Sequence, residues 1–61
     1  MKVNYIKTID FTFEDVEVLN AETEEKLLHK IKESEILKIR NGTEIEYINP
    51  DYIMYFKLEE K

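Results

Sequence analysis

The side chains best suited to chemistry in this sequence are one histidine and the carboxylates around it. Glu25, His29 and Glu33 follow one another at intervals of four residues, so a helix would place all three on one face. This spacing could hold a surface metal ion or orient the imidazole ring. A solvated helix flank with paired charges explains the same pattern, and a metal there would lack a supporting second shell. We therefore predict no metal site and no cofactor.

Residues for nucleophilic catalysis are scarce. The sequence has no cysteine, Ser34 is its only serine, and no serine, histidine and aspartate form a recognisable set. Glu44 and Glu46 would share one side of a strand, as a general acid–base pair does. One such pair among 14 acidic residues is no signal, and it equally fits a polar outer sheet face. A single glycine cannot form a phosphate-binding loop. We predict that the protein is not an enzyme.

The charge and the apolar runs bear on possible partners. Tyr47, Tyr52 and Tyr55 could stack on bases, but the net charge of −5 and the scattered basic residues argue against nucleic acid. The longest apolar run, 52–56, is far shorter than the roughly 20 residues that span a bilayer. No apolar stretch near the beginning of the chain resembles a signal peptide. We expect a cytoplasmic protein with no nucleic-acid or membrane partner.

The first elements that would position these residues are two strands and a helix. Apolar and polar residues alternate over 3–13, which predicts a strand. A turn at Glu14–Asp15 and a short strand over 16–19 would follow; the alternative is one long bent strand with a bulge. Asn20 is the predicted N-cap of a helix over 21–33. The apolar residues of that helix, at spacings of three and four, are Leu27, Leu28 and Ile31.

The last part of the chain predicts a hairpin, a turn and a final strand. Asn41-Gly42 lies between two alternating segments, 35–40 and 43–48, which is a strong hairpin signal. A three-residue loop over 40–42 would place Leu37 opposite Ile45 and give Gly42 a left-handed conformation. Residues 49–51, Asn-Pro-Asp, predict a turn. Apolar residues on both faces of the strand 52–58 suggest a central strand, or one that meets a partner; 59–61 would be a solvated end.

One segment has a local resemblance. Residues 41–53, NGTEIEYINPDYI, resemble the NG…YINPDxI run near the start of the FlbD-type flagellar proteins, over 13 of the 61 residues. The resemblance implies a shared hairpin-and-turn structure. No function is carried over from it.

Together the elements predict one small α+β domain over 1–61. Its order is ββαβββ, with an antiparallel sheet of four to five strands and one helix packed on one face. The sheet face away from the helix would expose an apolar partner interface. The residues expected on that face are Ile6, Ile36, Ile53 and Tyr55.

The exposed face suggests what the protein does. Domains of this size often need a disulfide, a metal or a second subunit, and with no cysteine we expect a homodimer. The function that we infer is a non-enzymatic, acidic protein–protein interaction module. It would act as a small homodimeric regulator or inhibitor, of the kind with which a phage or prophage blocks a host factor, and could bind a foreign protein. The alternative is a DNA mimic that inhibits a nucleic-acid-binding enzyme.

Overall fold

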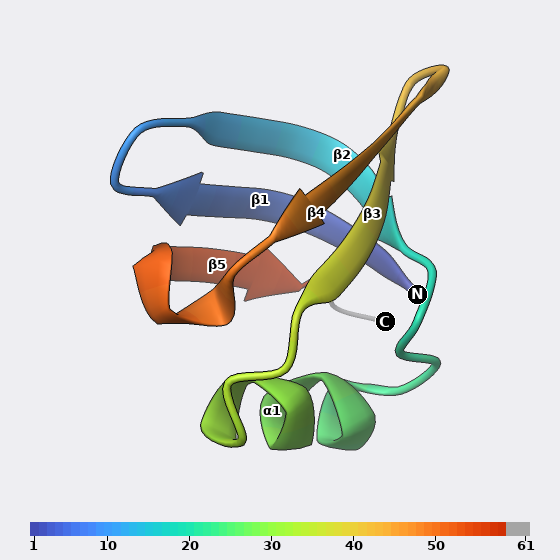
Figure 1. Cartoon of the computed structure of the whole chain (residues 1–61). Coiled ribbons are helices and arrows are strands. Elements are labelled where there is room, and N and C mark those ends of the chain that lie inside the picture. Colours follow the sequence, from blue (N-terminus) through green and yellow to red (C-terminus); the bar gives the residue numbers. More distant parts are fainter. Residues whose placement is uncertain (59–61) are drawn as a thin grey trace.

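Residues 1–58 fold as one five-stranded antiparallel sheet with one α-helix (Figure 1). A computed structural model describes residues 1–58; the solvated end expected at 59–61 lies outside them. The predicted α+β class and ββαβββ order are confirmed. The elements are β1 (Lys2–Thr8), β2 (Thr12–Val18), α1 (Glu24–Lys32), β3 (Leu37–Asn41), β4 (Glu44–Ile48), the 3₁₀ helix η1 (Pro50–Tyr52) and β5 (Ile53–Leu58).

The sheet is strongly curled. Its strand order is β4-β3-β2-β1-β5, so β4 and β5 lie at opposite edges. In a flat sheet, four strand spacings would separate them by about 19 Å. The connection from Ile48 to Ile53 contains η1, whose residues rise only about 2 Å each, so the sheet must bend to bring the two edges together (Figure 1). Because the strand order ends at β5, β5 is an edge strand, and the interpretation of this segment as a central strand is wrong.

The first hairpin turns earlier than its sequence predicted. Lys7 pairs with Thr12, and the Thr8 backbone N–H donates to the Phe11 carbonyl at 2.8 Å, so the turn lies at Ile9–Asp10. Glu14–Asp15 is inside β2, where Asp15 has a φ of 51°. Aspartate tolerates this left-handed conformation better than most residues. The predicted turn at Glu14–Asp15 is wrong because the change in alternation there reflects a kinked strand.

The same irregularity moves Ile6 into the core. Two consecutive residues, 14 and 15, are exposed between the buried Phe13 and Val16. The facing strand β1 changes phase over 4–5, between Val3 and Ile6, where its register with β5 also shifts. Ile6 is only 2% exposed. The expectation that Ile6 lies on an exposed sheet face is wrong, because strict alternation does not continue through the kink.

The helix starts later than predicted, and Asn20 has a different role. Thr23 is the N-cap, and its Oγ1 accepts from the Lys26 backbone N–H at 3.2 Å. The Asn20 side chain instead joins the end of β2 to β3: its Nδ2 donates to the Ile36 carbonyl at 2.9 Å, and its Oδ1 accepts from the Lys38 N–H at 3.0 Å. Because these bonds direct the Asn20 amide toward β3, the cap falls to Thr23, and the predicted N-cap at Asn20 is wrong.

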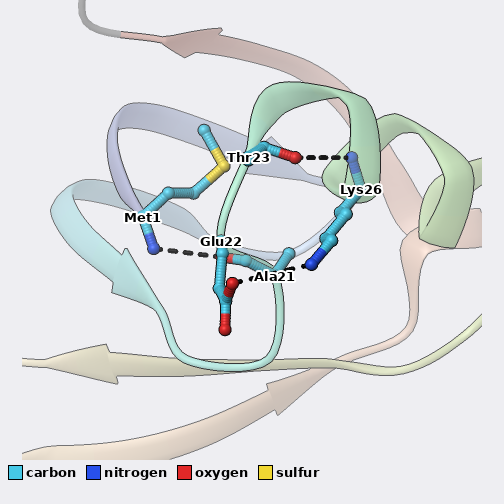
Figure 2. A network of polar contacts seen from close by, with 5 residues as sticks. All are labelled: Met1, Ala21, Glu22, Thr23 and Lys26. Atoms are coloured by element: carbon cyan, nitrogen blue, oxygen red, sulfur yellow. Dashed lines mark hydrogen bonds and ion pairs between the residues drawn. The ribbon is translucent and has the colours of Figure 1, made fainter.

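Contacts at both ends hold α1 in place. Figure 2 shows the first: the Met1 ammonium nitrogen donates to the Ala21 carbonyl at 3.1 Å, and Lys26 pairs with Glu22 at 3.5 Å. At the other end Ser34 has a φ of 56°. The N–H groups of residues 34 and 35 donate to the carbonyls of residues 31 and 30, which is the Schellman arrangement.

The β3–β4 hairpin has a tighter loop than predicted. Asn41 pairs with Glu44, so the loop is Gly42-Thr43 and the proposed three-residue loop is wrong. The φ of Gly42 is 63°, and a glycine at the first loop position suits a type II′ turn. Leu37 faces Ile48, not Ile45. This register is preferred because it pairs two buried residues and leaves Ile45 42% exposed on the other face.

One core lies between the curled sheet and α1. Leu27 is the buried residue of α1, while Leu28 is 47% exposed. Ile31, Ile53, Phe56 and other half-buried side chains pack around this core. The buried apolar residues are Val3, Ile6, Phe13, Val16, Val18, Ala21, Leu27, Leu37, Ile39 and Ile48.

Candidate functional site: an aromatic groove

The structure does not bring the four predicted interface residues onto one surface. Ile6 belongs to the core, and Ile53 is half-buried against it. Ile36 is 48% exposed in the segment between α1 and β3. Tyr55 is also 48% exposed but lies on β5, where its ring meets that of Tyr5 edge-on at 5.9 Å. The predicted apolar face is thus reduced to separate positions.

The histidine lies beside an open polar depression. Glu25, His29 and Lys30 line it together with residues of the segments before and after α1, and its volume is about 630 Å³. Within residues 1–58, no group of three or more histidine, aspartate and glutamate side chains is arranged to hold a metal ion. The depression carries acidic and basic side chains side by side, so it favours no single sign of charge in a ligand.

Four aromatic side chains line a second hollow, which we call the aromatic groove. It lies between the β1–β2 turn with the start of β2 on one side, and the end of β4 with η1 on the other. Its volume is about 300 Å³. Figure 1 shows the β1–β2 turn and η1 near one another at the left of the molecule. The lining residues are Thr8, Asp10, Phe11, Phe13, Glu46, Tyr47, Ile48, Asn49 and Tyr52.

The aromatic groove has a buried floor and exposed walls. Phe13 and Ile48 are 8% and 6% exposed and belong to the core. Phe11, Tyr47 and Tyr52 are 66%, 67% and 56% exposed. Large aromatic side chains this exposed in so small a domain leave apolar area available to a ligand. Because the floor belongs to the packed core, a ligand would find the lower surface already formed.

A threonine hydroxyl holds the first wall. Thr8 is 7% exposed, and its Oγ1 accepts from the Phe11 N–H at 3.0 Å and lies 3.2 Å from the Phe11 carbonyl oxygen, to which it donates. The N–H of Ile9 donates to the Tyr52 carbonyl at 3.1 Å. The β1–β2 turn is therefore bonded directly to η1, and this bond sets the two sides of the groove against one another.

The opposite wall is held by the cap of η1. The Asn49 Oδ1 accepts from the Asp51 N–H at 2.9 Å, and the Asn49 carbonyl accepts from the Tyr52 N–H at 3.1 Å. Ser34, just after α1, donates its hydroxyl to the Asp51 carboxylate at 2.7 Å. The predicted turn at 49–51 is confirmed, and it fixes the backbone from which Tyr52 extends.

The charged residues of the groove are both acidic. Asp10 and Glu46 line it, and no lysine or arginine of residues 1–58 does. Glu46 is held by Asn41, whose Nδ2 donates to Glu46 Oε2 at 3.2 Å. The two ion pairs within the described residues, Lys26–Glu22 and Arg40–Glu17, lie elsewhere. The groove thus combines aromatic walls with carboxylates that no basic side chain of these residues neutralises.

Sequence reasoning found parts of this groove without joining them. The sequence suggests Tyr47 and Tyr52 as residues that could stack on bases, and its alternation places Phe11 on a strand face. The available signal was the position of Tyr52 directly after the predicted turn at 49–51; the turn beside Phe11 is visible only in the structure. Their proximity depends on the curl of the sheet, which no local pattern contains.

Comparison of the chain with protein-family models, with curated proteins and with solved structures found no match. No family assignment therefore accompanies the local resemblance of residues 41–53. Within residues 1–58 no helix has the length and apolar character needed to cross a membrane.

Proposed function

We propose that this protein is a small, non-enzymatic interaction module that binds another protein through the aromatic groove. The observation that carries the proposal is the combination of a buried floor, three exposed aromatic side chains in the walls and two carboxylates with no basic partner among residues 1–58. Tyrosine, with an apolar body and a polar end, is enriched among the residues that dominate binding at the centres of protein interfaces, and two of the three exposed rings are tyrosines. In the proposed role the module regulates or inhibits its partner by occupying one of the partner's surfaces.

Self-association is part of the proposal. Met54 and Tyr55 of the edge strand β5 are 66% and 48% exposed, and Tyr55 shares the outer face with Tyr5. A second copy of the chain could cover this face about a twofold axis. In sedimentation at micromolar concentration we expect a dimer that Tyr55→Glu dissociates and Tyr52→Glu does not. A 7.4 kDa monomer for the parent protein would exclude the dimer.

The charge pattern supports a DNA mimic less well. A mimic needs carboxylates along one surface without intervening cations. Glu22 pairs with Lys26 at 3.5 Å and Glu17 with Arg40 at 3.5 Å. Both signs of charge therefore mix on α1 and across β2 and β3, as on an ordinary protein surface. The aromatic groove supports a binding role better than the acidic surface does.

Matched variants test the proposed role of the groove. The tagged protein, Tyr52→Ala and Tyr55→Ala would each be used to recover partners from cells that express the protein naturally. Each variant removes one half-exposed tyrosine. Tyr52 lines the groove, whereas Tyr55 lies outside it on the face proposed for self-association, so the pair separates the two surfaces. We expect a partner that is retained by the parent and by Tyr55→Ala, and that Tyr52→Ala loses at least tenfold.

Circular dichroism would establish that both variants remain folded. Calorimetry with the purified partner would then give the change in affinity directly. A partner that Tyr52→Ala binds as tightly as the parent would contradict the proposal, as would the recovery of no partner by any of the three proteins.

A further inference from the structure

The chemistry of the aromatic groove points to a particular side chain in its ligand. We infer that the bound segment presents an arginine, whose guanidinium stacks on the exposed rings and pairs with the carboxylates of Asp10 and Glu46. This inference rests on the proposed function, because it identifies what the interaction module recognises. It commits to an extended segment of a partner protein as the occupant.

Charge complementarity is the first argument. Asp10 and Glu46 line the groove with no basic neighbour there among residues 1–58, and the chain as a whole carries a net charge of −5. The field at the groove therefore attracts cations and repels acidic segments. Glu46 already accepts from Asn41 through Oε2, which orients its carboxylate and leaves Oε1 as an acceptor for a ligand.

Among residues 1–58, no basic side chain lines this groove. The only arginine of the chain, Arg40, pairs with Glu17 at 3.5 Å. Lys57 extends over the Tyr55 ring, with its Nζ 5.8 Å from the centroid. Both contacts lie outside the groove lining. Residues 1–58 thus supply no cation to Asp10 and Glu46, and the inference assigns this role to the ligand.

The aromatic walls favour arginine over lysine. Phe11, Tyr47 and Tyr52 are each more than half exposed, so their ring faces are accessible to a ligand. A guanidinium is planar and weakly hydrated; it stacks on aromatic rings and can form two parallel hydrogen bonds to a carboxylate. A lysine ammonium is a strongly hydrated point charge and loses more hydration on entering such a groove. The aromatic rings of the groove match the planar face of the guanidinium, and its carboxylates match the charge and the paired hydrogen-bond donors.

The size of the groove favours a chain segment over a folded surface. Its volume of about 300 Å³ is at the lower end of the range for ligand pockets, enough for one or two large side chains. The floor formed by Phe13 and Ile48 is apolar. An arginine with an apolar neighbour, presented by an extended segment, would fill both the rim and the floor.

An octapeptide with one arginine between two leucines is the probe for this inference. It would be titrated to millimolar concentration into the full chain, with the ring resonances of Phe11, Phe13, Tyr47 and Tyr52 followed by NMR. The matched probes replace arginine by lysine or by citrulline, which has the same shape without the charge. We expect saturable shifts on these rings, binding several-fold weaker with lysine, and no saturable binding with citrulline.

Variants of the protein complete the test. Glu46→Gln keeps the acceptor for Asn41 and removes the charge, and Asp10→Asn does the same at the other carboxylate. Each should weaken binding of the arginine peptide about three- to fivefold, the effect of a partly exposed ion pair. Glu14→Gln is the control, because Glu14 is exposed on β2 and does not line the groove; it should leave the affinity unchanged.

The outcomes separate this inference from the proposed function. It is overturned if the arginine peptide causes no saturable shift of the groove rings, if citrulline binds equally well, or if Glu14→Gln weakens binding as much as Glu46→Gln. If a natural partner still depends on Tyr52 in that case, the interaction module stands and its ligand has a different chemistry.

Discussion

The hydroxyl of Thr8 provides the sharpest test of how the groove is held. Replacing Thr8 by valine keeps the β-branched shape and removes only the oxygen. That oxygen accepts from the Phe11 N–H at 3.0 Å, whereas the Phe11 carbonyl keeps its bond from the Thr8 N–H at 2.8 Å. The variant therefore leaves the Phe11 N–H without its partner. Thr8, which supplies that partner, is only 7% exposed.

The expected loss follows from that single donor. A buried donor without a partner costs about 1–3 kcal/mol of the free energy of unfolding. The Phe11 N–H is only partly buried, so water can replace part of the bond and about 1–1.5 kcal/mol is the expected range. For a chain of 61 residues, the whole free energy of unfolding is about 3–9 kcal/mol. The midpoint of thermal unfolding should fall by about 4–12 °C.

Denaturant unfolding followed by circular dichroism measures this change. Thr12→Val is the matched control, because Thr12 is exposed at the start of β2 and its change should stay within about 0.5 kcal/mol. Thr8→Val should also weaken any ligand of the aromatic groove, since Phe11 loses the bond that positions its backbone. If Thr8→Val unfolds at the same denaturant concentration as Thr12→Val, the hydroxyl does not hold the turn and the argument for a preformed wall fails.

Three further predictions concern the rest of the chain. Gly42→Ala should lower the free energy of unfolding by about 1 kcal/mol or more in thermal unfolding, because the φ of Gly42 is 63° although no atom lies within 4 Å of the added Cβ; an unchanged melting temperature would refute this. Leu27→Ala should cost about 2–5 kcal/mol in denaturant unfolding and Leu28→Ala much less, since they are 2% and 47% exposed; equal losses would contradict the placement of α1. His29→Gln should leave both the fold, measured by circular dichroism, and partner binding, measured by calorimetry, unchanged. Elemental analysis should find no stoichiometric metal. A loss of binding or a bound metal would overturn the non-catalytic, metal-free interpretation.

Local patterns were sufficient wherever neighbouring residues decide the structure. The hairpin around Gly42, the turn begun by Asn49 and the helix containing Leu27 all form where the sequence indicates, because turn residues and helical spacing act over a few positions. Their boundaries were less secure. Asn20 and Thr23 are both good N-caps, and the choice between them depended on whether Asn20 was needed by β3.

Patterns of alternation failed where a strand changes its phase. Strict alternation predicts the wrong face for Ile6 because β1 and β2 kink together at the position of Asp15, and a period of two carries no information about such a shift. The β3–β4 register failed for a related reason. Both Ile45 and Ile48 could face Leu37, and only burial in the assembled core selects Ile48.

The aromatic groove is a feature that local sequence patterns do not predict. By itself the sequence determined that the chain is acidic, has no cysteine and has few groups for catalysis, and it predicted the order of strands and helix. Only the tertiary structure placed Phe11 and Phe13 of the first hairpin beside Tyr47 and Tyr52. The physical reason is the curl of the sheet: the short connection through η1 draws opposite edges together, and residues about 35–40 positions apart in the sequence then share one groove because of how the whole core packs.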